Sequence, residues 1–305
     1  MLSLPVEVLA TVQQDSLRKQ RTLPSHFVGD HPLLDIASLR EPLRPYLEKI
    51  GEIFVAFLEQ DSGNLCYGLR LRGERWFVKL GANPDSFEQV LPLARSVSHP
   101  ALPALRHQFA SSDGPVLVYP FVSGEVLNSP KFPGEAGRRR AGSAHARFRA
   151  LAATEIAAAL DVIYDLHLAV AACGIVAVDF YDGSVLYDFE HRQTHVIDLD
   201  AYRPGPFTLT SDRLPGSTRF MAPEELQCGA RIDQVTNVYT LGRTALVLLG
   251  NGSRERSAWR GNEAAHAVAL RATEPERERR YASVSGFVAA WRAAMHAVDS
   301  SEAVD

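Results

Sequence analysis

The chain has 305 residues, of which 46% are hydrophobic and 22% are charged, and this composition excludes a wholly disordered protein. The formal net charge of −4 gives no electrostatic reason to expect nucleic acid as a partner. No apolar run approaches the roughly 18–20 residues that a membrane-spanning helix needs, so we expect no membrane partner either.

The cysteines and the first residues bear on the compartment. Cys66, Cys173 and Cys228 are scattered, odd in number and without metal-ligand spacing, which is typical of reduced thiols. Residues 1–8 do not combine a basic region with an apolar core, as a signal peptide would. We therefore expect a cytoplasmic protein.

The first part of the chain changes from a helical to a strand pattern near residue 51. Residues 42–50 carry apolar side chains at helical intervals, which predicts a short amphipathic helix. Three apolar runs follow, and good turn sequences separate them. They predict an antiparallel meander with strands at residues 53–58, 65–71 and 76–80.

A helix and two further strands are predicted next. The helix covers residues 85–96, with Pro84 near its first turn. The strands cover residues 104–110 and 116–119, and residues 111–114 form the turn between them.

The chain then passes through a connection and becomes helical. Residues 128–148 are rich in Gly, Ser, Pro and Arg, which predicts a loop or linker. The apolar residues at 152–170 predict a long helix that is mostly buried.

Several short motifs stand in a fixed order along the chain. Lys79 lies in Phe-Val-Lys-Leu, Asp179 in Val-Asp-Phe-Tyr-Asp-Gly-Ser, and Asp198 in His-Val-Ile-Asp-Leu-Asp, while residues 222–224 read Ala-Pro-Glu. In this order and spacing they resemble the motifs of the protein-kinase superfamily, as in a small divergent bacterial Ser/Thr protein kinase-like protein.

The resemblance covers about residues 50–293 and implies an α+β, bilobal protein kinase-like fold. An N-terminal lobe with a five-stranded antiparallel sheet and a helix would precede a mainly helical C-terminal lobe. The division that it implies is an N-terminal extension, an N-lobe, a hinge with a linker insertion, a C-lobe and a tail, at residues 1–50, 51–122, 123–150, 151–296 and 297–305.

The resemblance also implies ATP and Mg²⁺ as cofactors and gives roles to three residues. Phosphoryl transfer needs positioned phosphates, metal-binding carboxylates and a group that orients the attacking hydroxyl. By resemblance, Lys79 would hold the phosphates, Asp179 would act as the base, and Asp198 would bind Mg²⁺. A carboxylate that closes an apolar strand is costly to bury unless it meets a cation or donors, so the position of Asp198 indicates a purpose.

The chain departs from the family pattern around these residues. Ala177 and Val178 replace the His and Arg before the catalytic Asp, and Ser184 stands where the family has a metal-binding Asn. Asp200 replaces the Gly of Asp-Phe-Gly. Because Mg²⁺ prefers oxygen ligands, we hypothesise that Asp200 helps to hold a second ion.

The nucleotide-contacting segments are less complete. The glycine-rich loop retains one of its three glycines, and a plain hairpin turn explains this segment equally well. The proposed phosphate contacts are Ser62, Gly63 and Asn64. Tyr119 takes the gatekeeper place, and the proposed adenine contacts are the backbone groups of Pro120, Phe121 and Val122.

The expected helix partner of Lys79 is Glu88. It is the only acid well inside the predicted helix at residues 85–96, but it lies two residues before the family position. Two residues rotate a helix by about 200°, so Glu88 facing away from Lys79 stays open as an alternative. Farther along, Asn237 replaces a structural Asp, and we expect a Glu224–Arg280 salt bridge.

Three functions follow from this pattern. The first is an ATP- and Mg²⁺-dependent phosphotransferase that acts on a protein or small-molecule hydroxyl acceptor. The alternatives are a pseudokinase that binds nucleotide or serves as a scaffold, which the departures favour, and a small-molecule kinase, which Asp200 and Tyr181 favour.

Overall fold

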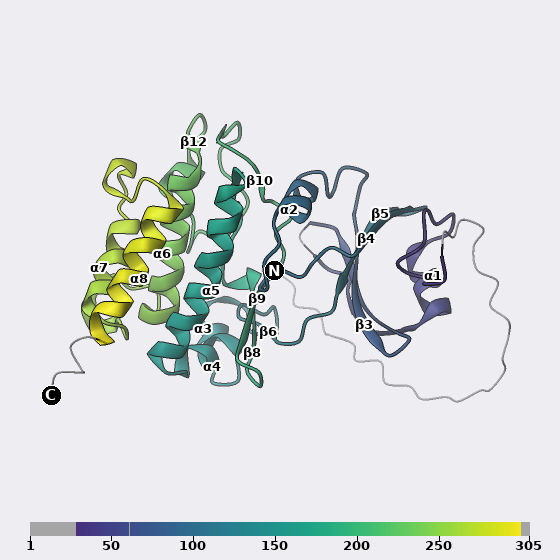
Figure 1. The fold of residues 1–305 in the computed structure, drawn as a ribbon, viewed down its shortest axis with the longest axis horizontal. Coiled ribbons are helices and arrows are strands. Elements are labelled where there is room, and N and C mark those ends of the chain that lie inside the picture. The colour runs from purple at the N-terminus through teal and green to yellow at the C-terminus, as the bar shows by residue number, and fades with distance from the viewer. Residues whose placement is uncertain (1–28, 61, 300–305) are drawn as a thin grey trace.

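The computed structural model describes residues 29–60 and 62–299. Within them the chain forms an α+β fold, with an antiparallel five-stranded sheet and eight α-helices. Figure 1 shows the sheet at one end of the molecule, the longer helices at the other, and short strands between them. None of the helices in the described part of the chain is long and apolar enough to cross a bilayer.

The five-stranded sheet was predicted correctly. Its strands pair in the order β1-β2-β3-β5-β4, and all four pairings are antiparallel. A turn at Arg72 and Gly73 joins β2 to β3, and the first three strands pair in chain order as the expected meander. The strands are β1 (Glu52–Phe57), β2 (Leu65–Leu71), β3 (Glu74–Leu80), β4 (His107–Ser111) and β5 (Gly114–Pro120).

The amphipathic helix α1 (Leu43–Ile50) is confirmed, and it is part of the sheet's core. Its buried face packs against apolar residues of β2 and β3. The preceding segment is tied to the sheet edge as well, because the Leu39 N–H donates to the Ala110 carbonyl at 2.8 Å. The described residues of the predicted extension are therefore built into the sheet-bearing part, while residues 1–28 lie outside the described residues.

The helix predicted at residues 85–96 is shorter in the structure. Residues 84–89 form turns, and α2 begins only at Val90 and ends at Ser96. Pro92 explains the difference, since a proline is tolerated in the first turn of a helix but not in its interior. A helix that began at residue 85 would place Pro92 in its interior.

The prediction of a loop or linker at residues 128–148 is wrong in part. This segment contains α3 (Gly134–Arg138) and the start of α4 (Ala144–Ala150). The Ser143 hydroxyl caps α4 by accepting from the Ala146 N–H at 3.0 Å. Phe148 anchors the helix, because its ring is fully buried and packs edge-on against Tyr187.

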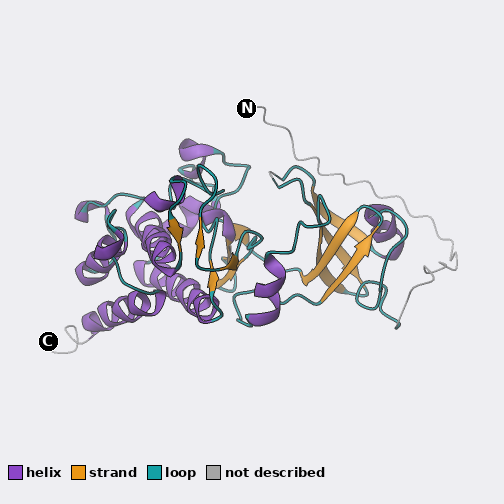
Figure 2. Cartoon of the chain, turned by 90° about the horizontal axis from the view of Figure 1, so that it is seen from above, coloured by secondary structure: helices purple, strands orange, loops and turns teal. Residues whose placement is uncertain are grey.

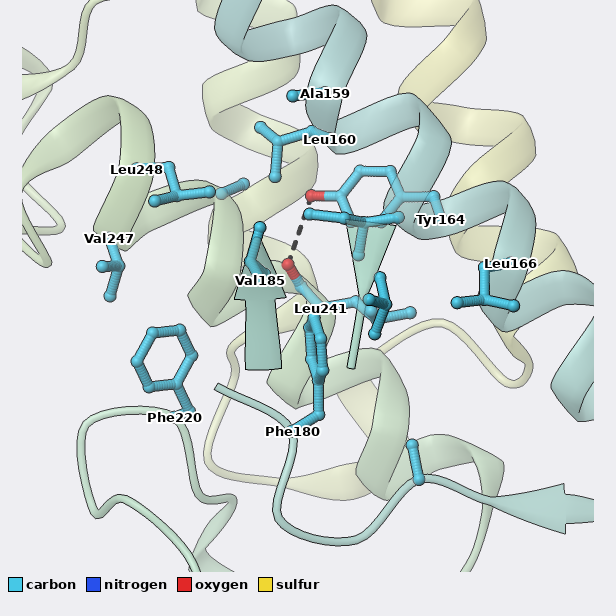
Figure 3. Close-up of a cluster of buried hydrophobic side chains, with 14 of the residues drawn as sticks. Ala159, Leu160, Tyr164, Leu166, Phe180, Val185, Phe220, Leu241, Val247 and Leu248 are labelled. Carbon is cyan, nitrogen blue, oxygen red and sulfur yellow. Dashed lines mark hydrogen bonds between the residues drawn. The ribbon is translucent and has the colours of Figure 1, made fainter. Parts of the chain in front are cut away.

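The helical part is organised around α5 (Ala153–Ala172), the helix predicted at residues 152–170. Figure 3 shows its side chains packing against those of α6, with the Tyr164 hydroxyl donating to the Leu241 carbonyl at 3.2 Å. Thirteen of the seventeen residues of α6 are buried, so it runs through the core of this part. The remaining helices are α6 (Gln234–Gly250), α7 (Glu263–Ala272) and α8 (Val284–Asp299).

Short strands lie between the large sheet and the helices (Figure 2). Three of them form a small sheet in the order β6-β8-β9, and the other four pair in twos, β7 with β10 and β11 with β12. They are β6 (Glu125–Val126), β7 (Ile175–Val176), β8 (Val185–Asp188), β9 (Gln193–Val196), β10 (Arg203–Pro204), β11 (Phe207–Thr208) and β12 (Arg231–Ile232).

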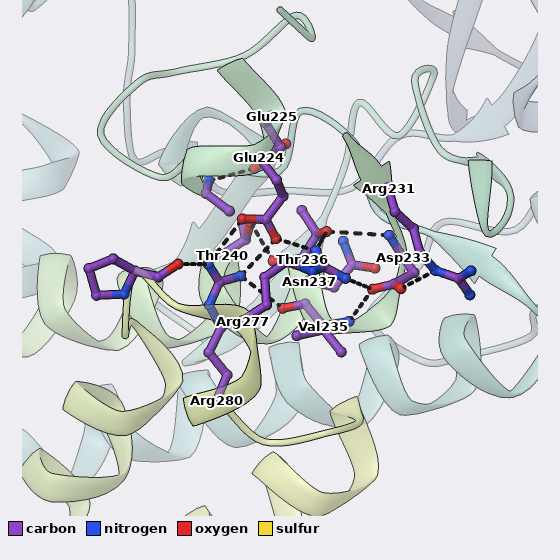
Figure 4. Close-up of polar contacts among 12 residues, drawn as sticks. Glu224, Glu225, Arg231, Asp233, Val235, Thr236, Asn237, Thr240, Arg277 and Arg280 are labelled. Atoms are coloured by element: carbon purple, nitrogen blue, oxygen red, sulfur yellow. Dashed lines mark hydrogen bonds and ion pairs between the residues drawn. The ribbon is translucent and has the colours of Figure 1, made fainter. Parts of the chain in front are cut away.

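The predicted Glu224–Arg280 salt bridge is confirmed. Both side chains are buried, and the guanidinium binds the two carboxylate oxygens at 2.7 and 3.0 Å. Arg277 also binds Glu224, at 2.5 Å, and Asp233 at the start of α6, at 2.7 Å (Figure 4). The network therefore fixes residues 222–224 to the start of α6 and to the chain before α8.

Replacing Arg280 by Ala should lower the free energy of unfolding by roughly 3 kcal/mol, because Glu224 stays buried after losing one of its two cations. Because Arg277 still binds Glu224 in this variant, we expect a loss of stability near the low end of the range usual for a broken buried ion pair. Urea unfolding measures it. The matched control is Arg279→Ala, since Arg279 is exposed and should change stability by less than about 0.5 kcal/mol. Equal losses in the two variants would contradict the role of the network.

Candidate active site

A buried lysine on the sheet meets two carboxylates from the helical part. Strand β3 places Lys79 opposite Cys66 of β2 and Leu117 of β5, and only 9% of its side chain is exposed. Its Nζ lies 3.2 Å from Asp198 Oδ1 and also donates to Asp200 Oδ2. The sequence separations are 119 and 121 residues, so these ion pairs join the two ends of the molecule.

The charges in this cluster support one another. Burial by itself lowers the pKa of Lys79, but the carboxylates of Asp200 and Asp198 outweigh burial and raise it above its usual range. The pKa of Asp200 is raised by its burial and by Asp198, against the opposing effect of Lys79. The Lys79 ammonium faces two acids at once. The lysine therefore keeps its proton.

The position of Asp198 differs from the sequence expectation, which placed its carboxylate at the end of a buried strand. Strand β9 ends at Val196, and 55% of the Asp198 side chain is exposed. Its backbone takes a left-handed conformation, with φ of 58°, which turns the chain so that Leu199 enters the core instead. Non-glycine residues in this region are uncommon and cluster at functional sites.

The β1–β2 turn reaches this cluster through Asn64. The Asn64 side-chain amide donates to Asp200 Oδ2 at 3.2 Å, and its oxygen accepts from the Ala82 N–H at 3.0 Å. Asn64 is only 3% exposed, and its two hydrogen bonds hold the Asp200 side chain in position. Of the other predicted phosphate contacts, Ser62 and Gly63 are exposed, and Gly63 has the positive φ of 72° that the turn requires.

Asp179 occupies a constrained loop between β7 and β8. It is half-buried and has a left-handed backbone, with φ of 61°. Two residues earlier, Ala177 is held by the Asn237 amide of α6, which accepts from the Ala177 N–H at 2.9 Å and donates to its carbonyl at 2.7 Å. From the other side Gly216 approaches so closely that a Cβ there would lie 3.1 Å from Asp179 Oδ1.

Ser184, predicted as a metal ligand, lies in the interior. It is fully buried, and its hydroxyl donates to the Asp179 carbonyl at 3.5 Å. The Ser184 carbonyl accepts from the Ile197 N–H at 2.9 Å, next to Asp198. The residue thus connects the Asp179 loop to the Asp198 turn, and its hydroxyl would have to leave this position to reach a metal ion.

Glu88 is not the partner of Lys79. It lies exposed in the turns before α2, and the acids on Lys79 are Asp198 and Asp200. The late start of α2 at Val90 leaves Glu88 outside the helix that was expected to aim it inward.

The predicted adenine-binding segment covers the end of β5 and the residues that follow it. Tyr119 lies beside the cluster, and its pKa is raised by burial and by the charge of Asp200. The Phe121 N–H donates to the Arg75 carbonyl at 2.9 Å, and its ring packs edge-on against Phe54. That backbone donor is therefore used within the protein.

The available donors suit a metal ion shared with a phosphate. In residues 29–60 and 62–299, no three His, Cys, Asp or Glu side chains gather in a way that could hold a metal ion. Mg²⁺ is commonly held by only one or two carboxylates together with water and substrate phosphates. Asp198 and Asp200 fit that pattern, and the chain would then supply the carboxylates while a polyphosphate supplies the rest.

A second buried acid, Glu225, lies near Asp179. Its carboxylate accepts from the Ala222 N–H at 2.7 Å, and the side chain is 3% exposed. Burial raises the pKa of Glu225 to about 8, and the charges of Glu224 and Asp179 add to the effect. Sequence reasoning missed this residue, because nothing in the order of residues 222–226 shows that the second of two adjacent acids faces inward.

No protein-family model matches the chain, and no curated protein matches it. The chemistry of the site therefore follows from the residues that the fold brings together.

Glu225→Gln should flatten the pH dependence of stability. The pKa of Glu225 is raised from 4.5 to about 8 on folding, so its contribution to stability is complete below pH 4.5 and is lost as the pH rises through 8. The slope removed is at most about 1.4 kcal/mol per pH unit. Urea unfolding of both proteins between pH 5 and 9 measures it, with the exposed Glu278→Gln as control. Parallel curves for wild type and Glu225→Gln would show the prediction to be wrong.

Proposed function

We propose that the chain is an ATP- and Mg²⁺-dependent phosphotransferase of the protein-kinase superfamily, resembling a Ser/Thr protein kinase. It transfers the γ-phosphate of ATP to a hydroxyl acceptor, with Asp179 as the base and Asp198 as a metal ligand. The observation that carries the proposal is the meeting of buried Lys79 with Asp198 and Asp200 across the two ends of the molecule.

The cluster carries the charges that a magnesium–nucleotide complex needs. One lysine and two carboxylates leave a local excess of negative charge, which attracts a divalent cation. With a nucleotide bound, Lys79 would hold phosphate oxygens in place of a carboxylate, and the carboxylates of Asp198 and Asp200 would hold the metal ion in place of the ammonium. Because each charge keeps a partner of opposite sign, none is left buried alone.

Asp179 has the properties of an acceptor-orienting base. Its carboxylate is half-buried, and its loop is fixed by Asn237 on one side and Gly216 on the other. In the proposed transfer the acceptor oxygen attacks the γ-phosphorus and its proton passes to Asp179, while the bond to the β,γ-bridging oxygen breaks and ADP leaves. A bound Mg²⁺ would neutralise charge on the phosphates, and Asp198 and Asp200 would hold it.

The proposal includes the architecture. The five-stranded sheet with α1 and α2 would be the N-lobe of a kinase-like fold, and α5 to α8 would form the C-lobe. The Glu224–Arg280 pair supports this assignment, because it fixes residues 222–224, which resemble the family's Ala-Pro-Glu, to the helical part.

A pseudokinase is the second candidate. Burial of the Ser184 hydroxyl favours it, since the chain then lacks an exposed side chain at the place of the family's metal-binding Asn. In that case the same cluster would bind nucleotide, or hold the two parts of the molecule together, without phosphoryl transfer.

Thermal unfolding with ATP, with and without Mg²⁺, and a turnover assay test the proposal together. ATP at 100 times its dissociation constant should add roughly 2.7 kcal/mol to stability, and the shift should require Mg²⁺. Lys79→Met should lose the shift. Asp179→Asn should keep it and lose turnover by roughly 10²–10⁴-fold.

The control is Glu88→Gln, which should match wild type in both assays because Glu88 is exposed and away from Lys79. A magnesium-dependent shift without turnover would favour the pseudokinase. No shift with any nucleotide would overturn the phosphotransferase and leave a pseudokinase whose cluster holds the two parts of the molecule together.

A further inference from the structure

An arginine-lined cavity lies in the helical part, outside the Lys79 cluster. It has a volume of about 590 Å³ and is bounded by α3, α4, the end of α6 and the segment that follows Gly216. This size is in the range of ordinary ligand sites. Five arginines line it and only one acid, Glu135; the arginines are Arg138, Arg139, Arg149, Arg219 and Arg243.

Two of the five arginines are neutralised. Arg139 forms an ion pair with Glu135 at 2.5 Å. Arg219 binds the two oxygens of the fully buried Asp182 at 3.1 and 2.9 Å. The one acid among the lining residues, Glu135, is thus already paired, and three arginines are left.

The other three have no ion pair within the part of the chain that the structure describes. Arg149 donates to the Asn251 side-chain oxygen at 2.9 Å, and Arg243 donates to the Arg219 carbonyl at 3.0 Å. These acceptors are neutral, and no hydrogen bond from the Arg138 side chain is present in the described residues. The cavity therefore carries about three uncompensated positive charges.

This arrangement is unfavourable without an anion. Burial lowers the pKa of Arg138, Arg149 and Arg243, and neighbouring guanidinium groups lower it further. The carboxylates of Asp182 and Glu135 offset part of this effect at Arg138. A guanidinium does not lose its proton in proteins, so a negative ligand in the cavity would reduce the repulsion between these groups. Arginine binds phosphate through paired N–H donors, and a phosphoryl group carries a charge of about −1.5 to −2.

One wall of the cavity is connected to the loop of Asp179. Asp182, three residues after Asp179, holds Arg219 in the two-oxygen contact described above. Arg219 in turn lies three residues after Gly216, which packs directly against Asp179. A group bound in the cavity and a hydroxyl presented to Asp179 would thus contact the same two segments of the chain.

We propose that the cavity binds a phosphoryl group already present on a protein acceptor, so that the preferred substrate is a phosphorylated peptide segment. This inference rests on the proposed phosphotransfer for its meaning, but the binding itself needs neither ATP nor turnover.

The test is fluorescence anisotropy with a labelled degenerate peptide mixture that has a central phosphoserine, compared with the same mixture carrying serine. The phosphorylated mixture should bind at least about tenfold more tightly. Arg138→Gln should remove about tenfold of that affinity, and Arg149→Gln should do the same. The matched control is Arg140→Gln, two residues away, exposed and outside the cavity, which should bind like wild type.

Thermal unfolding in the absence of ligand checks that each variant is folded. Equal binding of the two mixtures would overturn the proposal, and so would equal binding by Arg138→Gln and Arg140→Gln. Inorganic phosphate that binds as tightly as the phosphorylated mixture would also overturn it, because the cavity would then hold a free anion. A failure of the phosphotransfer proposal shows separately, as absent turnover in a protein that still binds the phosphopeptides.

Discussion

The ion pairs of Lys79 with Asp198 and Asp200 are the contact on which the rest of the site depends. They place a buried ammonium from the sheet against carboxylates from the helical part, and Asn64 adds a hydrogen bond from the β1–β2 turn. Burying Lys79 and Asp200 separately would cost several kcal/mol each, whereas together they are partnered, and the half-exposed Asp198 adds a second carboxylate. The same three side chains thus form the charged site and help to hold the sheet against the helical part, together with apolar contacts from α2.

The helical part supports this contact with polar groups in its interior. The Asn237 amide fixes the chain before Asp179, and the Glu224 network fixes the segment after Gly216. Both are anchored on α6, which is buried along most of its length. Asp179 and Asp198 take left-handed backbone conformations, which need support from their surroundings. Asn237 of α6 supplies it two residues before Asp179, and the Ser184 carbonyl supplies it next to Asp198.

The sequence predicts helices and strands better than it predicts which side chains contact one another. The five strands, α1 and α5 follow from apolar periodicity and turn residues, and the Glu224–Arg280 pair follows from a motif. The start of α2 was missed because Pro92 outweighs the favourable residues before it. Local patterns do not encode contacts between segments that are distant in the sequence. For this reason the sequence did not predict that Asp200 takes the place of Glu88 beside Lys79, that Asn64 binds Asp200, or that arginines line a cavity.

The most direct test of the central claim is a crystal structure with a non-hydrolysable ATP analogue and Mn²⁺ in place of Mg²⁺. The anomalous signal should place a metal ion within about 2.0–2.3 Å of carboxylate oxygens of Asp198 and Asp200. In the same structure the Lys79 ammonium should contact phosphate oxygens in place of at least one carboxylate. A nucleotide bound elsewhere, or no metal at these acids with the Lys79 ion pairs intact, would contradict the account.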